Sequence, residues 1–327
     1  MEKTVTKRKV VIIGTGLVGS SCAFSLVHQS LCEELVLIDV NHERAVGEAL
    51  DLLHTMSYMP TVTKVKAGTY ADCHDANVII IAAGGPPKPG ETRLDSLQTS
   101  AKICQAIVPE VMKSGFSGHF LVISNPVDVI AYYVWQLSGL PSSHVLGTGT
   151  AIDSARLQAI LAQRFGLNPK SVQAVALGEH GDSQMVPWSQ VMIANQPLDQ
   201  WLAAQGQVLS LEERAQIRTE TARAGWEIFQ RKGTTYYGIA AAANAIVKAI
   251  LHDEQTVLPV STRVTGQYGY HDVYFGTPAL LGANGVEAVY EVPLTAAEME
   301  QLAHSVTTLQ QAQASLPAVI KSGVAEA

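Results

Sequence analysis

The chain has 327 residues, of which 47% are hydrophobic and 16% are charged, and its formal net charge is −7. This length predicts two domains, and no lysine or arginine run is longer than residues 7–9, which argues against a nucleic-acid-binding protein. Residues 1–9 are polar and no apolar run reaches the roughly 20 residues of a membrane span, so we expect a cytoplasmic protein that does not bind membranes.

The cysteines show neither the spacing of metal ligands nor the density of a secreted disulfide framework. They are Cys22, Cys32, Cys73 and Cys104. We therefore expect reduced thiols and no metal site, and a catalytic cysteine is the less favoured alternative.

The first predicted element is an apolar strand, residues 9–13, which runs into the sequence GTGLVG and then into an amphipathic helix that ends near Ser30. In this pattern Gly14 permits the tight turn, Gly16 lets main-chain N–H groups approach a pyrophosphate, and Gly19 allows close packing of helix on strand. The helix N-terminus adds partial positive charge. The pattern favours a dinucleotide site over an ordinary glycine-rich turn.

A second predicted strand, residues 34–40, carries Asp39 near its end, twenty residues after Gly19. A carboxylate at this place can accept both ribose hydroxyls of an adenosine. Because it also repels a 2′-phosphate, the sequence predicts NAD rather than NADP as the cofactor. An NADP-dependent reductase of a neutral carbonyl is the alternative that Asp39 opposes.

Strands and helices alternate through the rest of the first half: a helix over residues 41–56, strands over 62–67 and 78–83, a helix over 94–113, and a strand from residue 119. Such alternation predicts parallel strands with right-handed crossovers. The predicted fold class is therefore α/β, a Rossmann-type doubly wound parallel sheet followed by an α+β domain. We place an NAD-binding domain at residues 8–149 and a substrate and catalytic domain at residues 150–320.

A long loop over residues 82–94 joins the fourth strand to its helix and carries Arg93 at its far end. The carboxyl ends of parallel strands lie at one edge of a sheet, so this loop, Gly14 and Asp39 should face one crevice, together with Asn125. The loop predicts a lid that delivers Arg93 to a ligand, and the alternative is a solvated connection with a surface arginine. Asn125 is expected to contact the ligand or only to form a turn.

Polar side chains of the second half supply the groups that hydride transfer needs. Asp153 and Arg156 lie three residues apart on a predicted helix and so share one face, and His180 ends an apolar, strand-like run between thin, glycine-containing flanks. Moving a hydride to or from an oxygen-bearing carbon requires a proton donor or acceptor, and histidine has a suitable pKa. Asp153 can orient that histidine, Arg156 can bind a substrate carboxylate, and Arg93 can polarise the carbonyl. Taken singly, they would be a surface ion pair and a structural histidine.

The remaining segments predict helices over residues 211–231, 236–252 and 295–316, and short strands and turns over residues 257–291. One face of the last helix carries Met299, Leu302, Val306 and Leu309. We expect these segments to wall the substrate pocket and to pack it against the sheet.

Taken together, the motifs resemble the NAD-dependent L-2-hydroxyacid dehydrogenases of the lactate/malate dehydrogenase superfamily, over residues 10–309. The matching stretches are GTGLVG from Gly14, PGETR ending at Arg93, SNPVD from Ser124, GTAIDSAR ending at Arg156, GEHGD from Gly178, KGTTYYG from Lys232 and LPVS from Leu258. Several motifs in one order argue against chance.

By this resemblance His180 is the acid/base, Asp153 its partner, Arg156 the carboxylate anchor and Arg93 the loop arginine. The resemblance also implies a homotetramer that acts on a small 2-oxo or 2-hydroxy acid. Further substrate contacts are assigned to Asn125 and Thr235. Cofactor contacts are assigned to Gly14, Gly16, Leu17, Val18, Gly19, Asp39, Ala83, Gly84, Ser124, Asn125 and Ile239.

Departures from the family pattern bear on the substrate. The residue six before the loop arginine is usually glutamine in lactate dehydrogenases and arginine in malate dehydrogenases, but here it is Pro87. Without a cation there, a second carboxylate would be uncompensated, so oxaloacetate is disfavoured. Gly225 stands where lactate dehydrogenases usually carry alanine and enlarges the pocket by about a methyl group. Conversion of pyruvate to L-lactate is the first choice, and longer apolar 2-oxo acids, as in hydroxyisocaproate dehydrogenases, are the alternative.

Regulation is also predicted from departures. Lactate dehydrogenases that are activated by fructose-1,6-bisphosphate resemble this chain but carry an arginine and a histidine at the positions of Gln158 and Gln173. Neutral amides cannot replace two cations that face phosphates, so we expect no activation by that sugar. A nucleotide-binding protein that has lost catalysis is a further alternative, but every catalytic position holds a competent residue, which favours an enzyme.

Overall fold

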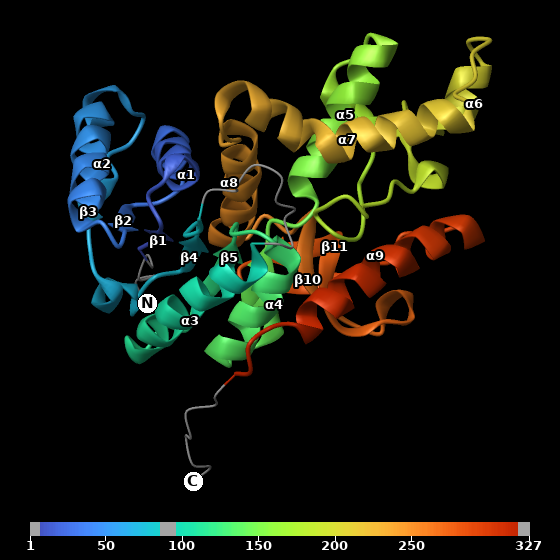
Figure 1. Ribbon diagram of the computed structural model, residues 1–327. Helices are drawn as coiled ribbons and strands as arrows, with labels where there is room; N and C mark the ends of the chain where they lie inside the picture. Colours follow the sequence, from blue (N-terminus) through green and yellow to red (C-terminus); the bar gives the residue numbers. More distant parts are fainter. Residues whose placement is uncertain (1–6, 86–95, 320–327) are drawn as a thin grey trace, which may run out of the picture.

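One continuous sheet runs through the computed structural model, which describes residues 7–85 and 96–319 (Figure 1). Its strand order is β12-β11-β10-β6-β5-β4-β1-β2-β3. The parallel strands are β1 (Lys9–Ile13), β2 (Glu34–Ile38), β3 (Lys64–Ala67), β4 (Val78–Ile81), β5 (His119–Val122) and β6 (Val145–Gly147). The order 3-2-1-4-5-6 is that of a doubly wound dinucleotide-binding sheet, so the predicted fold class is confirmed.

Helices cover both faces of this sheet, because its parallel strands are apolar on both faces. One face packs against α1 (Leu17–His28), α2 (His42–Thr55) and α8 (Tyr237–Leu251). The other face packs against α3 (Leu97–Lys113), α4 (Val127–Ser138) and α9 (Ala296–Ala314). Successive strand residues therefore alternate between two cores.

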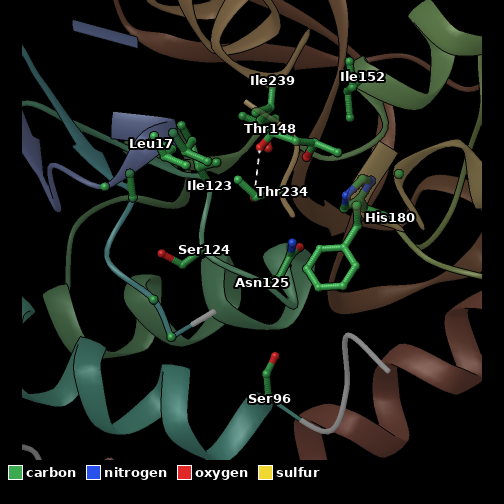
Figure 2. Close-up of a pocket in the computed structure, with 18 of the residues that line it drawn as sticks. Leu17, Ser96, Ile123, Ser124, Asn125, Thr148, Ile152, His180, Thr234 and Ile239 are labelled. Atoms are coloured by element: carbon green, nitrogen blue, oxygen red, sulfur yellow. Dashed lines mark hydrogen bonds between the residues drawn. The ribbon is translucent and has the colours of Figure 1, made fainter. Parts of the chain in front are cut away.

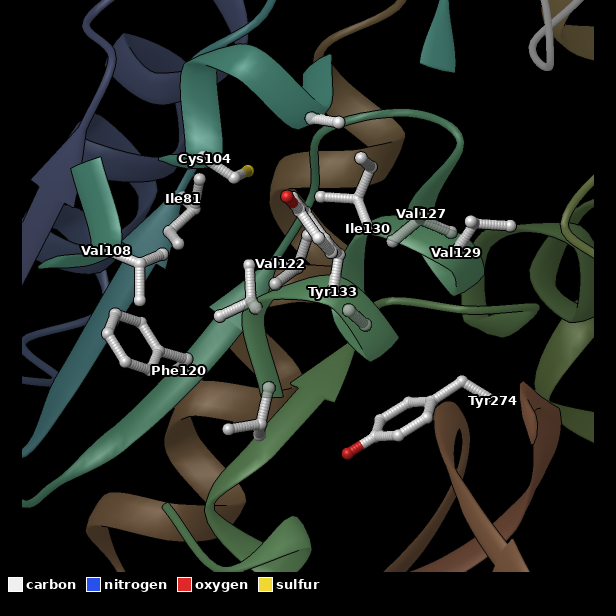
Figure 3. Close-up of a cluster of buried hydrophobic side chains, with 14 of the residues drawn as sticks. Ile81, Cys104, Val108, Phe120, Val122, Val127, Val129, Ile130, Tyr133 and Tyr274 are labelled. Carbon is white, nitrogen blue, oxygen red and sulfur yellow. The ribbon is translucent and has the colours of Figure 1, made fainter. Parts of the chain in front are cut away.

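The core under α3 and α4 shows this packing most clearly. Ile81 of β4 and Phe120 of β5 lie beside Val108 of α3 in Figure 3, with Tyr133 of α4 close by. All four side chains are at most 1% exposed. A sheet fixed so firmly holds the carboxyl ends of β1, β4 and β5 in one plane, and the site is built from the loops that follow them.

Strands of the second half extend the same sheet. β10 (Thr256–Thr265) pairs antiparallel with β6 and with β11 (His271–Gly282), and β12 (Gly285–Val289) pairs with β11. The prediction of only short strands here was wrong, since β10 has 10 residues and β11 has 12. Pro259 and Pro278 lie opposite each other in the register and interrupt neither strand.

A separate core lies at the upper right of Figure 1. It joins α5 (Ala151–Phe165), α6 (Leu198–Ala203) and α7 (Leu211–Lys232) to the small antiparallel sheet of β7 (Val172–Gln173), β8 (Met192–Ile193) and β9 (Gln196–Pro197). The strand predicted to run up to His180 is regular only in β7. Beyond β7 the chain is held by isolated bridges, from Leu177 to Met185 and from Gly178 to Gly276.

Short 3-10 helices complete the described parts of the chain. They are η1 (Met56–Tyr58), η2 (Tyr70–Cys73), η3 (Ser142–His144), η4 (Pro169–Ser171), η5 (Trp188–Gln190) and η6 (Gln267–Gly269). Within residues 7–85 and 96–319, no helix combines the length and the apolar character that crossing a membrane would require.

Candidate active site

The turn after β1 is closed by glycine. Gly14 has a φ of +98°, and its N–H donates to the carbonyl of Ile38 on β2 at 2.8 Å. A Cβ at Gly14 would lie 2.6 Å from the main-chain nitrogen of Ala83, and one at Gly19 would lie 1.9 Å from the Gly14 carbonyl oxygen. Both positions therefore require glycine, one for a left-handed turn and one for close approach of α1 to the strand.

Gly16 differs from these two glycines because the space around it is open. It is the N-cap of α1, with an extended backbone, and a Cβ there would meet no described atom within 4 Å. No described side chain caps this helix, so its first N–H groups point toward that space. These residues fit the pyrophosphate of a dinucleotide, which a helix N-terminus stabilises.

Asp39 follows β2 at the same edge of the sheet. Its Oδ2 accepts hydrogen bonds from the N–H and the hydroxyl of Thr15 at 2.7 and 3.0 Å, and its Oδ1 accepts one from the N–H of Asn41 at 2.9 Å. Partial burial opposes ionisation, but the two N–H donors and the hydroxyl outweigh it and lower the pKa of the carboxyl. Asp39 is therefore an anion at neutral pH, and Oδ1 keeps acceptor capacity for a ribose hydroxyl.

A cavity of about 710 Å³ extends from this turn across the carboxyl ends of β4, β5 and β6. Figure 2 shows Leu17 and Ser124 toward one side of it and His180 toward the other. The predicted site residues that line it are Gly16, Leu17, Val18, Gly84, Ser124, Asn125, Arg156, His180, Gly225, Thr235 and Ile239. The other predicted site residues that the structure describes are not part of the lining: Gly14, Gly19, Asp39, Ala83 and Asp153. The volume falls in the range of small-molecule and cofactor sites.

His180 and Asp153 form a pair at the polar end of the cavity. Nδ1 of His180 makes a hydrogen bond with Oδ2 of Asp153, which is fully buried at the start of α5. The His180 ring itself is 9% exposed and lines the cavity. The partner of Nδ1 fixes the tautomer and the orientation of the ring, which suits Nε2 to exchange a proton with a molecule in the cavity.

Arg156 shares the same carboxylate. Its Nη1 donates to Oδ1 of Asp153 at 3.1 Å, so the two residues meet on one face of α5, as their spacing indicated. The Arg156 side chain is 13% exposed and lines the cavity. A guanidinium has five N–H donors in a planar fork, so it can keep this contact and also bind a carboxylate.

The loop after β5 is fixed by two hydroxyl groups. The Ser124 hydroxyl donates to the carbonyl of Ala83 at 2.6 Å, and the Ser100 hydroxyl of α3 donates to the carbonyl of Asn125 at 2.6 Å. The peptide bond between Asn125 and Pro126 is cis. These contacts hold the exposed Asn125 side chain at the cavity, across from Leu17 (Figure 2).

One face of α7 forms a wall of the cavity. Gly225, Trp226, Phe229 and Lys232 line it, and their spacing is helical. The Trp226 and Phe229 rings pack edge to face with centroids 5.5 Å apart. Of this wall the sequence predicted only Gly225; its helical neighbours at i+1, i+4 and i+7 were the signal that could have found the rest.

Arg93 and Pro87 lie outside the described residues. The described chain on either side of them, Gly84 and Gly85 before and Ser96 after, lines the cavity. Asp128 and Gln184 are among the other residues near the site that escaped prediction. Asp128, the last residue of the motif SNPVD, was given no role, but it accepts a hydrogen bond from the main-chain N–H of His180. The amide nitrogen of the buried Gln184 lies 3.4 Å from Oδ1 of Asp153.

Two family models match the chain. One, described as the lactate/malate dehydrogenase NAD-binding domain, matches residues 8–147, and the other, described as the lactate/malate dehydrogenase alpha/beta C-terminal domain, matches residues 150–319. L-lactate dehydrogenase 3 of Bacillus thuringiensis subsp. konkukian is 51% identical over 298 residues, which is 91% of this chain and 94% of that protein.

Solved structures with the same fold include both a lactate and a malate dehydrogenase. The minor L-lactate dehydrogenase of Enterococcus mundtii, in its ligands-bound form, has a TM-score of 0.92 and 43% identity, with 95% of this chain and 99% of that chain covered. The malate dehydrogenase of Cryptosporidium parvum has a TM-score of 0.90 and 33% identity, with 95% and 99% covered. The likeness therefore extends over both halves of the chain.

Proposed function

The chain belongs to the lactate/malate dehydrogenase family and is an NAD-dependent dehydrogenase, and on this premise we propose that it interconverts a 2-oxo acid and an L-2-hydroxy acid, with pyruvate and L-lactate as the preferred pair. The observation that carries the proposal is the His180–Asp153 pair, which faces the same cavity as the glycine turn and Arg156.

The residues of the chain divide the reaction between them. NAD, when bound along the glycine turn, supplies or accepts the hydride. Arg156 binds the substrate carboxylate through its guanidinium group, and Asn125 offers an amide to the ligand. Asp153 orients His180 and stabilises its imidazolium form, so that Nε2 can give a proton to the carbonyl oxygen or take one from the hydroxyl. Arg93, assigned from the sequence, polarises the carbonyl.

Pyruvate is favoured over oxaloacetate by the chemistry of the described wall. Gly225, Trp226 and Phe229 present apolar groups to the cavity, and a second carboxylate beside them would be costly unless a cation paired with it. Lys232 lies on the same wall, but its ammonium group packs on the Tyr236 ring, 3.4 Å from the centroid. Pro87 supplies no such cation. A hydroxyisocaproate-type preference is the second candidate, since Gly225 lines the cavity and leaves room for a larger substrate side chain.

The test is a substrate panel with NADH: pyruvate, 2-oxoisocaproate, phenylpyruvate and oxaloacetate, each measured as kcat/KM. The proposal expects pyruvate to lead 2-oxoisocaproate by at least about tenfold, because one methylene in an apolar pocket changes kcat/KM by about 10–200-fold and 2-oxoisocaproate carries three more carbons. A lead of 2-oxoisocaproate would select the second candidate. A lead of oxaloacetate would refute both assignments.

We also propose that fructose-1,6-bisphosphate does not activate the enzyme. Gln158, at one of the two positions where activated relatives carry a cation, donates its amide to the carbonyl of Ala174 at 2.9 Å, so it serves a contact within the chain. Gln173, the last residue of β7, is neutral as well. The KM for pyruvate should stay constant on addition of the sugar bisphosphate, and a several-fold decrease would contradict this.

The assembly and the division of the chain are further proposals. We infer a homotetramer in the cytoplasm, an NAD-binding domain at residues 8–149 and a catalytic domain at residues 150–320, on the strength of the family relationship. Sedimentation velocity measures the assembly: a tetramer of this 34.9 kDa chain has about four times its mass, and a monomer at working concentration would contradict the proposal.

A further inference from the structure

A second carboxyl group, that of Asp128, contacts His180, at its main chain. Asp128 is the second residue of α4 and is 2% exposed, and its Oδ2 accepts the main-chain N–H of His180 at 2.8 Å. Asn125, three residues earlier, lines the cavity. One short stretch after β5 therefore serves two places in the site: Asn125 lines the cavity, and Asp128 bonds the main chain of His180.

That contact matters because the chain around His180 is irregular. Regular pairing ends with β7, and Gly178, which has a φ of +87°, is bridged to Gly276. The next N–H, of Glu179, donates to the Ser305 hydroxyl at 2.7 Å. Side-chain acceptors thus hold consecutive main-chain N–H groups, and the acceptor for His180 is Asp128. Its loss would free the main chain that carries the imidazole.

Three buried acids lie at or next to His180: Asp153 bonds its ring, Asp128 bonds its N–H, and Glu179 precedes it in the chain. They are 0%, 2% and 6% exposed. Three like charges so close together in a buried place repel one another strongly. Burial raises the pKa of Asp128 to about 7, and the charges of Glu179 and Asp153 act in the same direction. Asp153 pairs with the imidazole ring and with Arg156, and Glu179 accepts the N–H and the hydroxyl of Ser183. Asp128 pairs with no cationic side chain among the described residues, so we assign the proton to it.

A hydroxyl group beside Asp128 fits the protonated form. Ser261 of β10 is close enough to lower the pKa somewhat, as is the N–H of His180. However, Oδ1 of Asp128 and the Ser261 oxygen are both buried without a hydrogen-bond partner of good geometry among the described residues. A hydrogen bond between the two would give both atoms a partner, and it can form in either protonation state: the hydroxyl can donate to an ionised Oδ1, and a protonated Oδ1 can donate to the hydroxyl oxygen. The neutral form of Asp128 therefore costs no hydrogen bond at this position.

We propose that Asp128 is a positioning residue for His180: as a neutral acid it fixes the main chain that carries the imidazole, and it leaves Asp153 as the charged partner of the ring. The inference rests on the proposed function of His180. Above the pH at which Asp128 ionises, the added negative charge stabilises the imidazolium, so His180 keeps its proton to higher pH than it would beside a neutral residue.

Kinetics of two variants separate the two parts of the proposal. Asp128→Asn keeps an acceptor for the His180 N–H and stays neutral, so its kcat for pyruvate at pH 6 should be within about threefold of the wild type, whereas Asp128→Ala loses the acceptor and should fall at least about tenfold. The alkaline limb of kcat/KM, where protonated His180 is lost, should move to lower pH in Asp128→Asn by about half a unit or more.

Thermal unfolding without cofactor gives a second measure. An acid whose native pKa is raised favours folding in its protonated form, so the wild type loses stability as pH rises from the unfolded pKa, near 3.9, to about 7. The Tm of Asp128→Asn minus that of the wild type should therefore grow by several degrees, about 4 °C or more, between pH 4 and pH 8.

Glu298→Gln is the matched control, a buried acid that caps α9 and holds Ser189. Burial opposes its ionisation, but hydrogen bonds from Ser189 and Thr295 outweigh it and lower the pKa. Its contribution is therefore present above the unfolded pKa and lost as pH falls through the native pKa. The Tm of Glu298→Gln should drop relative to the wild type as pH rises above 4, opposite in sign to Asp128→Asn, and its alkaline limb should match the wild type.

Each result decides the matter. Lower kcat in Asp128→Ala, a shifted limb in Asp128→Asn and a growing Tm difference support the proposal; if Asp128→Ala does not fold, the two measurements on Asp128→Asn decide. Wild-type kcat, pH limb and Tm profile in these variants would overturn it while the proposed function stands. A wild type that turns over no 2-oxo acid would instead defeat the proposed function, and the positioning role with it.

Discussion

The two ends of the cavity are built in different ways. The cofactor end is a run of six residues, 14–19, whose main-chain conformation and open space fit a ligand. The acid at this end, Asp39, follows β2 and is partly exposed. The proton-transfer end joins residues from α4, α5 and the irregular chain before Met185, and its charged side chains are buried against one another. The first end should thus respond mainly to added volume, and the second to lost charge and hydrogen bonds.

Removal of the imidazole should have the largest effect at one end and none at the other. His180→Gln keeps a polar side chain of similar length but has no group that exchanges a proton near neutral pH. Acid/base catalysis contributes about 10²–10⁴-fold, so kcat for pyruvate should fall by that factor. The Kd for NADH, measured by fluorescence, should stay within about twofold. A parallel loss of NADH affinity would show that the two ends are not independent.

Arg156→Gln should act next in size, and on binding of the substrate. Loss of one partner of a buried charge pair costs about 2–5 kcal/mol, so kcat/KM for pyruvate should fall by about 30–5,000-fold, chiefly through KM. Arg156→Lys should recover only part of this, because an ammonium group cannot form the planar two-point contact. Equal activity of the lysine variant and the wild type would argue against carboxylate binding by the guanidinium.

How much of each end could be predicted follows from the same contrast. The glycine turn is contiguous, and each of its glycines has a local reason, so sequence alone assigned Gly14, Gly16 and Gly19 to the tasks that their geometry fits. The contact between Asp153 and Arg156 was also local, three residues apart on one helix. For His180 the sequence could indicate the proton-transfer chemistry but not the contacts that position the residue, because Asp128 and Asp153 come from distant segments.

Asp128 shows what the sequence could not provide. It lies 52 residues from His180 in the chain, and neither periodicity nor spacing predicts that its carboxyl meets that N–H. The long strands β10 and β11 were missed for a related reason, since their length comes from pairing with each other, in which Pro259 lies opposite Pro278, and not from local spacing. Phe229 was overlooked although its helical spacing from Gly225 was visible.

A pair of alanine substitutions at the cofactor end should separate fold from binding. Gly19→Ala places a methyl 1.9 Å from the Gly14 oxygen, so the backbone must shift and the free energy of unfolding should fall by about 1–3 kcal/mol. Gly16→Ala meets no described atom within 4 Å, so unfolding in urea should change by no more than about 0.5 kcal/mol. Its NADH affinity should nevertheless fall, because the methyl occupies the space that a pyrophosphate approaches. Unchanged NADH binding by Gly16→Ala would place the phosphates elsewhere.

The smallest effect should come from Gly225, which belongs to neither end but to the wall of α7 that meets the substrate side chain. Gly225→Ala adds one methyl group to the cavity, worth about 1 kcal/mol between a large and a small substrate, so the ratio of kcat/KM for 2-oxoisocaproate to that for pyruvate should fall about fivefold. The same change should stabilise α7 by about 0.5–1 kcal/mol, because glycine is a poor helix residue. The ratio of two substrates on one variant removes that stability effect, whereas either rate alone would not. A ratio that does not move would mean that Gly225 faces the cavity beyond the reach of the substrate, and selectivity would then rest on Phe229 or on the segment that contains Pro87.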